Sequence, residues 1–372
     1  MAKFRILSLD GGGIRGLFTA VLLDRLNTAV PGFLDGVSLF AGTSTGGILA
    51  LGLAAGLTPS QCAELYSKNG RLVFDDSAFD NLFDLGNAVG AQYSNENLKR
   101  LLADQFKSRG VTTLGDLRAK VVVSSFDLDN QDEISLQQKK AKDREKDDFR
   151  AWKPKFFHNF PGDDTDAGQL AVDVALRTSA APTYFPVYQG YIDGGVAANN
   201  PGMCAVAQAL TSKVDLNDMV LLSVSTGRNS RFLKDVQSKN WGWVQWAKPM
   251  LNLMLDANVG VADYQCQRVL QDNYYRLDPL LRDPNAPFGE RDLDISLDDW
   301  KQAGLLERLA GKVDLTEALQ WLRSHWLTDV AEAGSSPAPV PFSVPANQPR
   351  PGSKPKAKPK AKPRAASSRR RK

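Results

Sequence analysis

Short apolar runs alternate with amphipathic stretches as far as residue 227. The apolar and β-branched runs predict buried strands at 3–9, 37–41, 117–128, 187–193 and 218–227. Apolar side chains recur at helical spacing over 15–29, and shorter helices are predicted at 46–56 and 203–210. Strands that alternate with helices form mostly parallel sheets covered on both faces. The pattern therefore predicts one three-layer α/β domain over residues 1–333, with a mostly parallel central sheet flanked by helices.

Residues 36–63 contain no charged side chain and are long enough to cross a bilayer as a helix. Gly42, Gly46 and Gly47 interrupt the middle of this stretch, beside three hydroxyl residues. Glycine clusters of this kind mark a turn. We therefore expect a buried strand, a turn and a buried helix rather than a membrane span.

A second apolar segment, 241–260, is rich in tryptophan, methionine and leucine. Trp243, Trp246 and Met250 share helical spacing, and Pro249 is expected to kink or split the helix. Two interpretations stay open: a helix packed in the core, or an element that docks on a lipid surface. The first is favoured, because aromatic and methionine stripes usually pack inside a protein.

Charge divides the chain of 372 residues, whose net charge is +4. Residues 334–372 hold eleven Lys and Arg, no acidic residue and nine of the twenty prolines, so the body keeps 35 basic against 42 acidic residues. A segment of that composition cannot bury enough apolar surface to fold, which predicts a disordered basic tail. The segment 137–155, dense in both signs of charge, is predicted to be a solvated loop or an exposed hairpin.

The cysteines Cys62, Cys204 and Cys266 are odd in number and widely spaced. This spacing fits neither a disulfide framework nor a zinc site and suits a reducing compartment. The first ten residues contain no secretory apolar region. We therefore expect a cytoplasmic protein, and no cluster of His, Cys and Asp predicts a metal or another cofactor.

The segment GTSTG, from Gly42 to Gly46, is a G-x-S-x-G motif between a predicted strand and a predicted helix. In that context Ser44 lies on a sharp turn, with its hydroxyl exposed at the end of the sheet. The N–H groups at the start of the following helix point to the same place. The motif predicts a nucleophile at Ser44, and a glycine-rich turn that only packs is the alternative.

A nucleophilic serine needs a base. The two histidines are poorly placed, since His158 precedes any late acid and His325 lies near the end of an amphipathic helix. Asp193 ends an apolar strand and is followed by Gly194 and Gly195. Asp-Gly-Gly is also ordinary turn chemistry, but together with Ser44 it favours a Ser–Asp dyad.

The segment DGGGIRG contains Gly11, Gly13 and Gly16 in the G-x-G-x-x-G spacing of a dinucleotide-binding turn. The next strand runs into the serine motif instead of ending in a ribose-binding acid. The backbone N–H groups of Gly11, Gly12 and Gly13, with the charge of Arg15, can instead hold the oxyanion of an ester under attack.

Four blocks, LSLDGGGIRG, GTSTGG, LRTSAAPTYFP and DGGVAANNP, lie in this order between residues 6 and 202. Together they resemble the patatin-like phospholipases. The resemblance implies a Ser–Asp dyad without a catalytic histidine, in which Ser44 is the nucleophile, Asp193 the general base and Gly11 to Gly13 the oxyanion loop. At the turn that follows the acid, this chain has Asp-Gly-Gly, where many members have Asp-Gly-Ala. Residues 203–333 carry no matching motif.

The resemblance implies hydrolysis of acyl esters in phospholipids or related acyl lipids, with peripheral contact at the inner face of the membrane. A basic tail then suits anionic lipid better than nucleic acid, since no aromatic side chain interrupts its basic run. Some bacterial proteins that resemble this one are antiphage effectors activated by cyclic nucleotides. A non-catalytic nucleotide-binding module and a scaffold that works through its tail remain as alternatives.

Overall fold

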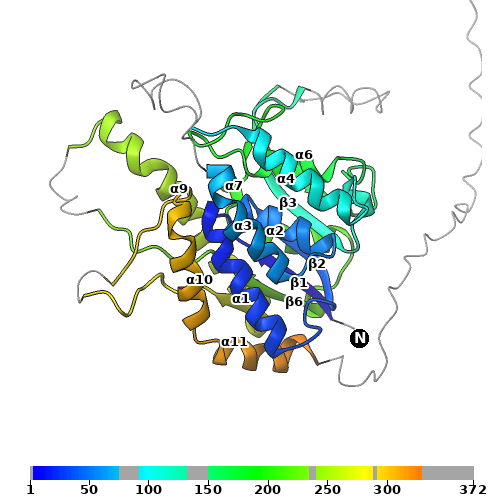
Figure 1. The fold of residues 1–372 in the computed structure, drawn as a ribbon. Coiled ribbons are helices and arrows are strands. Elements are labelled where there is room, and N and C mark those ends of the chain that lie inside the picture. The colour runs from blue at the N-terminus through cyan, green and yellow to red at the C-terminus, as the bar shows by residue number, and fades with distance from the viewer. Residues whose placement is uncertain (1–2, 75–91, 132–149, 234–239, 288–290, 329–372) are drawn as a thin grey trace, which may run out of the picture. The chain divides into compact units, whose positions relative to one another are not determined.

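A computed structural model describes residues 3–74, 92–131, 150–233, 240–287 and 291–328 (Figure 1). The chain divides into two units, Met1–Glu332 and Ala333–Lys372. Every described residue belongs to the first unit. The predicted disordered tail, 334–372, and residues 137–149 of the charged segment lie outside the described residues.

Within the described residues, seven strands form one sheet in the order β4-β3-β2-β1-β6-β7, and β5 also pairs with β3. The strands from β3 through β2, β1 and β6 to β7 are parallel, whereas β4 and β5 run antiparallel to β3. All five predicted strands are present, and β4 and β7 are additional. Their bounds are β1 Phe4–Leu9, β2 Val37–Thr43, β3 Lys120–Asp127, β4 Lys153–His158, β5 Tyr191–Asp193, β6 Met219–Val224 and β7 Tyr274–Leu277.

The predicted helices are confirmed as α1, α2 and α8, and further helices fill the two outer layers (Figure 1). The helices are α1 Gly16–Ala29, α2 Thr45–Ala54, α3 Pro59–Phe74, α4 Asn95–Ser108, α6 Ala171–Thr178, α7 Gly195–Ala198, α8 Gly202–Thr211, α9 Trp243–Leu270, α10 Ala303–Lys312 and α11 Thr316–Trp321. The charge-free stretch 36–63 is thus a strand, a turn and helices, as its glycines predict.

Alternate side chains of each central strand enter two separate cores. On β1, Leu7 and Leu9 pack with the core under α1 and α2, while Ile6 packs with α8 and the C-terminal part of α9. This alternation is the two-residue period of a strand buried on both faces. The two cores confirm the three-layer α/β architecture.

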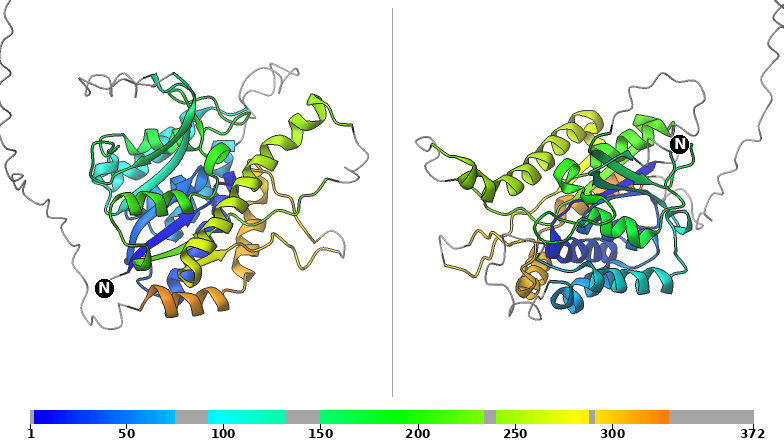
Figure 2. Two further views of the ribbon diagram at one scale, coloured as in Figure 1. Left: turned by 180° about the vertical axis from the view of Figure 1, so that it is seen from behind. Right: turned by 90° about the horizontal axis from the view of Figure 1, so that it is seen from above.

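Helix α9 departs from the sequence-based expectation in two ways. It runs unbroken for 28 residues through Pro249, which therefore does not split it. Its N-terminal part extends away from the rest of the unit (Figures 1 and 2), and Trp243 is 90% exposed. The interpretation of 241–260 as a core helix is wrong for this part. Helical spacing identifies a face but does not say what that face contacts.

Within the part of the chain that the structure describes, no helix combines the length and the apolar character that a membrane span requires.

Candidate active site

The turn between β2 and α2 holds Ser44 in a strained conformation. Its φ of 55° and ψ of −124° are rare for a residue with a side chain. Its backbone N–H donates to Thr178 Oγ1 at 2.8 Å, and the Thr178 hydroxyl in turn donates to the Ser124 carbonyl at 2.5 Å. Hydrogen bonds through Thr178 of α6 to Ser124 of β3 thus hold the sharp turn that the sequence motif predicts.

The glycines of this motif are needed because backbone passes too close for any side chain. A Cβ at Gly42 would lie 2.1 Å from the Gly46 carbonyl oxygen, and one at Gly46 would lie 2.2 Å from the Leu9 carbonyl oxygen. The turn is therefore pressed against the end of β1. That contact places Ser44 beside the glycine-rich loop that follows β1, where a Cβ at Gly11 would lie 3.2 Å from the Ser44 Cβ.

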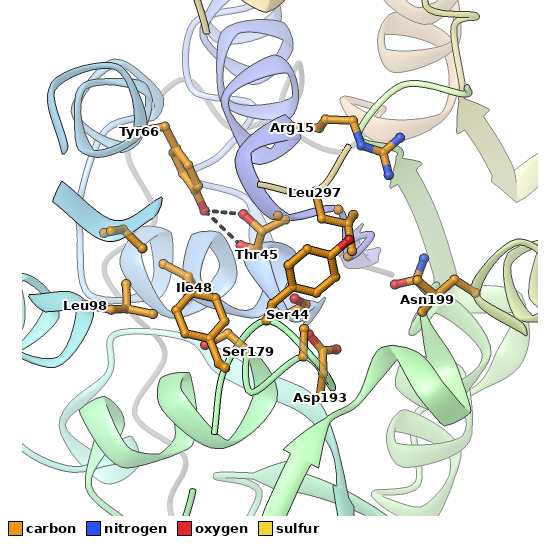
Figure 3. Close-up of a pocket in the computed structure, with 18 of the residues that line it drawn as sticks. Arg15, Ser44, Thr45, Ile48, Tyr66, Leu98, Ser179, Asp193, Asn199 and Leu297 are labelled. Carbon is orange, nitrogen blue, oxygen red and sulfur yellow. Dashed lines mark hydrogen bonds between the residues drawn. The ribbon is translucent and has the colours of Figure 1, made fainter. Parts of the chain in front are cut away.

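Asp193 reaches the serine because β5 runs antiparallel to β3. Ser125 of β3 pairs with Asp193, and the neighbouring Ser124 pairs with Thr43, the residue before Ser44. The last residue of β5 is thereby brought level with the end of β2. The structure brings Ser44 and Asp193 together, as the sequence predicts, and Figure 3 shows them side by side in the pocket.

Burial sets the electrostatics of Asp193. Loss of water raises the pKa of its carboxyl group to about 6, although hydrogen bonds from the Ser44 hydroxyl and the Gly195 N–H favour the charged form. The Gly195 N–H donates to Asp193 Oδ1 at 2.7 Å. The carboxylate is therefore ionised at neutral pH and basic enough to accept a proton.

The glycine-rich loop is fixed along its length. The Gly11 N–H donates to the Asn199 carbonyl at 3.1 Å, and the Gly11 carbonyl accepts from the Thr226 hydroxyl at 3.2 Å. Gly13 has a φ of +59°, and a Cβ there would lie 2.0 Å from the Leu297 carbonyl oxygen. Among the described residues, the Gly12 and Gly13 N–H groups have no hydrogen-bond partner. Two of the three expected donors are thus free, while that of Gly11 is occupied.

Arg15 lies at the pocket with only 8% of its surface exposed. Its Nη1 donates to the Gly227 carbonyl at 3.0 Å, which ties the loop to the segment after β6. Burial lowers the pKa of its guanidinium group to about 10, so it stays charged at neutral pH. The expected positive charge near the loop is therefore present, and part of its hydrogen-bonding capacity is used by the backbone.

An ion pair between Asp10 and Arg276 supports the loop from below, and the sequence did not reveal it. The Arg276 guanidinium holds the Asp10 carboxylate with two hydrogen bonds of 2.9 and 2.5 Å, and it also donates to Ser223 Oγ at 2.7 Å. Both partners are buried, with 3% and 10% side-chain exposure. Arg276 lies on β7, a short strand without a motif, so no sequence signal connects it with Asp10.

Tyr66 of α3 is another supporting residue that the sequence did not single out. Its hydroxyl lies 2.5 Å from the hydroxyl of Thr45, the residue that follows Ser44, and it also donates to the Thr45 carbonyl. The dashed lines in Figure 3 mark these two hydrogen bonds. A Cβ at Gly16 would lie 2.1 Å from the Thr45 hydroxyl oxygen and 2.9 Å from the Tyr66 ring. The last glycine of the loop motif therefore allows α1, α2 and α3 to meet behind the serine.

One pocket joins these groups. Ser44, Asp193, Asn199 and the glycine-rich loop line one part of it. The rest of the wall is mainly apolar and comes from α2, α3, α4 and the segment after α6, including Ile48, Leu65, Val73, Leu98, Leu102 and Phe185. Such a pocket suits a ligand with a polar reacting group and a long apolar chain.

Neither histidine lies at the pocket. His158 is buried on β4, with its Nε2 3.6 Å from an Asp164 oxygen, and His325 stacks on Trp321 with a ring distance of 5.6 Å. Neither is among the residues that line the pocket. Within the described residues, no group of three His, Cys, Asp or Glu side chains could hold a metal ion.

Comparison with known proteins agrees with this fold. The family model described as "Patatin-like phospholipase" matches residues 7–205, more than half of the chain. A cGAMP-activated phospholipase of Pseudomonas aeruginosa is 28% identical over 74% of this chain and 78% of its own length. Another cGAMP-activated phospholipase, from Vibrio cholerae, is 31% identical over 60% of this chain and 64% of its own length.

Among solved structures, the complex of ExoU with SpcU from Pseudomonas aeruginosa covers 89% of this chain and 57% of that chain, at 18% identity and a TM-score of 0.38. Assignment of the chain to a protein family rests on the family model and on the observed fold. The family model places this α/β fold in a class of lipid hydrolases. The chain belongs to the patatin-like phospholipase family.

Proposed function

We propose that this protein hydrolyses carboxylic esters of phospholipids or related acyl lipids with a Ser44–Asp193 dyad. The observation that carries the proposal is the buried Asp193 carboxylate, which lines the same largely apolar pocket as the buried Ser44. A carboxylate with a pKa of about 6 can take the serine proton directly and return it afterwards. Neither histidine is among the residues that line the pocket.

The reaction proceeds in two halves. The Ser44 oxygen attacks the acyl carbonyl carbon while its proton moves to Asp193, and the tetrahedral adduct then breaks its bond to the leaving alcohol, which takes that proton. Water next attacks the acyl–serine ester and gives a proton to Asp193. Cleavage of that ester releases the fatty acid, and the proton on Asp193 returns to the Ser44 oxygen.

The negative charge on the tetrahedral adduct needs fixed donors. The N–H groups of Gly12 and Gly13 are available for this role, together with the N–H groups at the start of α2. Gly11 makes room for Asn199 and Ser44, because a Cβ there would lie 2.2 Å from Asn199 Oδ1 and 3.2 Å from the Ser44 Cβ. Arg15 contributes its charge to the same end of the pocket. The expected oxyanion loop is thus proposed with Gly12 and Gly13 as its donors.

The test is covalent labelling of the full chain with a fluorophosphonate probe, read by mass spectrometry. We expect the label on Ser44, and we expect Ser44→Ala and Asp193→Asn to lose hydrolysis of short-chain and phospholipid esters. The fold of each variant is checked by circular dichroism. Substantial ester hydrolysis in either variant would contradict the dyad, and absence of labelling would favour a nucleotide-binding module or a scaffold.

A second proposal concerns regulation. Two of the similar proteins are named cGAMP-activated phospholipases, which favours activation of this chain by a cyclic dinucleotide. The test measures phospholipid hydrolysis with and without 3′,3′-cGAMP, with GMP and AMP as controls. A rate that does not change with the cyclic dinucleotide would identify a constitutive lipase or one with another activator.

A further inference from the structure

Helix α9 carries an apolar face that points to solvent instead of into the core. With about 100° of rotation per residue, five apolar side chains of its N-terminal part share an arc of roughly 100°. Their exposure ranges from 38% to 90%: Trp243, Trp246, Met250, Leu253 and Met254. Val261 and Tyr264 continue the same face, with 57% and 61% exposure. A face of this extent on a helix that projects from its domain is typical of an interaction surface.

The neighbouring face of the same helix belongs to the pocket. Leu251 and Leu255 line it, and a Leu255 methyl lies 2.8 Å from the Cβ position of Gly195, two residues after Asp193. Asn258 donates to the Gly195 and Val196 carbonyls at 3.5 and 3.3 Å. The C-terminal part is anchored in the core by Cys266 and Leu270. One rigid element thus forms a wall of the pocket and an apolar surface beside it.

We propose that this face of α9 docks on the surface of a lipid bilayer and places the mouth of the pocket against it. The inference rests on the proposed function, because the substrate it would deliver is an acyl lipid. A bilayer is the surface that we expect this face to contact, because the face is continuous with the wall of the pocket proposed to hydrolyse lipid. An acyl lipid that enters this pocket comes from a bilayer.

The composition of the helix fits this occupant. Between Trp241 and Leu255 the only charged residue is Lys248, and three tryptophans and two methionines lie in the same stretch. Tryptophan is enriched at the boundary between lipid and water, where its ring is buried and its N–H stays hydrated. Contact of this kind is driven by the burial of apolar surface. It therefore needs no anionic lipid and persists at high salt, unlike attraction through the basic tail.

The test is flotation of the full chain with phosphatidylcholine vesicles in about 0.5 M salt, which screens charge attraction. All proteins in this arm carry Ser44→Ala, so that the vesicles stay intact. We expect Trp243→Ser with Met250→Ser to lower partitioning by about tenfold or more. The matched control is Trp152→Ser, which removes a tryptophan of 73% exposure elsewhere on the surface. It should change partitioning by less than about twofold.

A second arm keeps Ser44. Trp243→Ser with Met250→Ser should leave hydrolysis of a soluble short-chain ester unchanged and should slow hydrolysis of vesicle lipid. Equal partitioning of the parent and the α9 variant overturns the proposal. So does a dimer, measured by light scattering, that dissociates in the α9 variant while the parent does not float with vesicles. If the parent does not hydrolyse the soluble ester, the proposed function fails, and flotation still reports on docking independently.

Discussion

The most informative perturbation is pH, because the proposed dyad requires Asp193 to be ionised before it accepts the Ser44 proton. Its pKa of about 6 follows from burial, against an ordinary value of 3.8. If only the ionised form works, kcat/KM is about half its maximum at pH 6 and about one-tenth at pH 5. Between pH 7 and 9 the rate should be flat. The assay is initial-rate hydrolysis of a soluble short-chain ester across this range.

Loss of activity in acid has to be separated from unfolding. The pKa of Asp193 is higher in the folded than in the unfolded chain, so its contribution to stability is fully present below the unfolded value. That contribution is lost as the pH rises through about 6. Titration of Asp193 therefore favours the folded state at pH 5 relative to pH 7. Thermal unfolding followed at both pH values is the control.

A histidine base would produce a similar acid limb, since the ordinary pKa of histidine is about 6.5. The double variant His158→Gln with His325→Gln distinguishes the two cases, because neither side chain lines the pocket. We expect the variant to keep both the midpoint near 6 and the plateau. A midpoint near 4, or loss of the acid limb in the variant, would refute the reasoning.

Three further outcomes are expected. Thr178→Val leaves the buried Ser44 N–H without its acceptor, so it should cost about 1–3 kcal/mol in the free energy of unfolding and slow fluorophosphonate labelling. Arg276→Met leaves the Asp10 carboxylate buried and unpaired, which should lower the free energy of unfolding by about 3–5 kcal/mol, as measured by chemical denaturation. Adding Asp10→Asn should recover part of this loss. Deletion of 334–372 should weaken binding to anionic vesicles and leave binding to neutral vesicles unchanged; the reverse pattern would contradict a role in anionic lipid binding.

The sequence predicted the three-layer fold because apolar runs and glycine turns are local signals. β1, β2 and α2 follow directly from them, and the strained Ser44 turn follows from the spacing of Gly42 and Gly46. The strand β5 was predicted within 187–193, but its antiparallel direction was not, because a strand of three residues carries no signal of which neighbour it joins. That direction, set by pairing with β3, is what brings Asp193 level with Ser44.

Features that depend on contacts distant in sequence stayed hidden. Arg276 and Tyr66 support the site from strands and helices that carry no motif, so only the fold connects them with Asp10 and Thr45. The exposure of the N-terminal part of α9 could not be predicted either, because its apolar residues have the same spacing whether that face contacts a core or solvent. The sequence also gave no sign that the Gly11 N–H is occupied, because its acceptor, the Asn199 carbonyl, is distant in sequence.

The ion pair between Asp10 and Arg276, which supports the glycine-rich loop, has a consequence for biosynthesis. Asp10 is among the first residues to leave the ribosome, but Arg276 follows 266 residues later, and the loop lacks its ion pair until then. Asp193 and β6 also come long after Ser44. A nascent or truncated chain therefore holds Ser44 without Asp193, the base that we propose for it. On the proposed function, ester hydrolysis can therefore begin only after most of the domain has been synthesised.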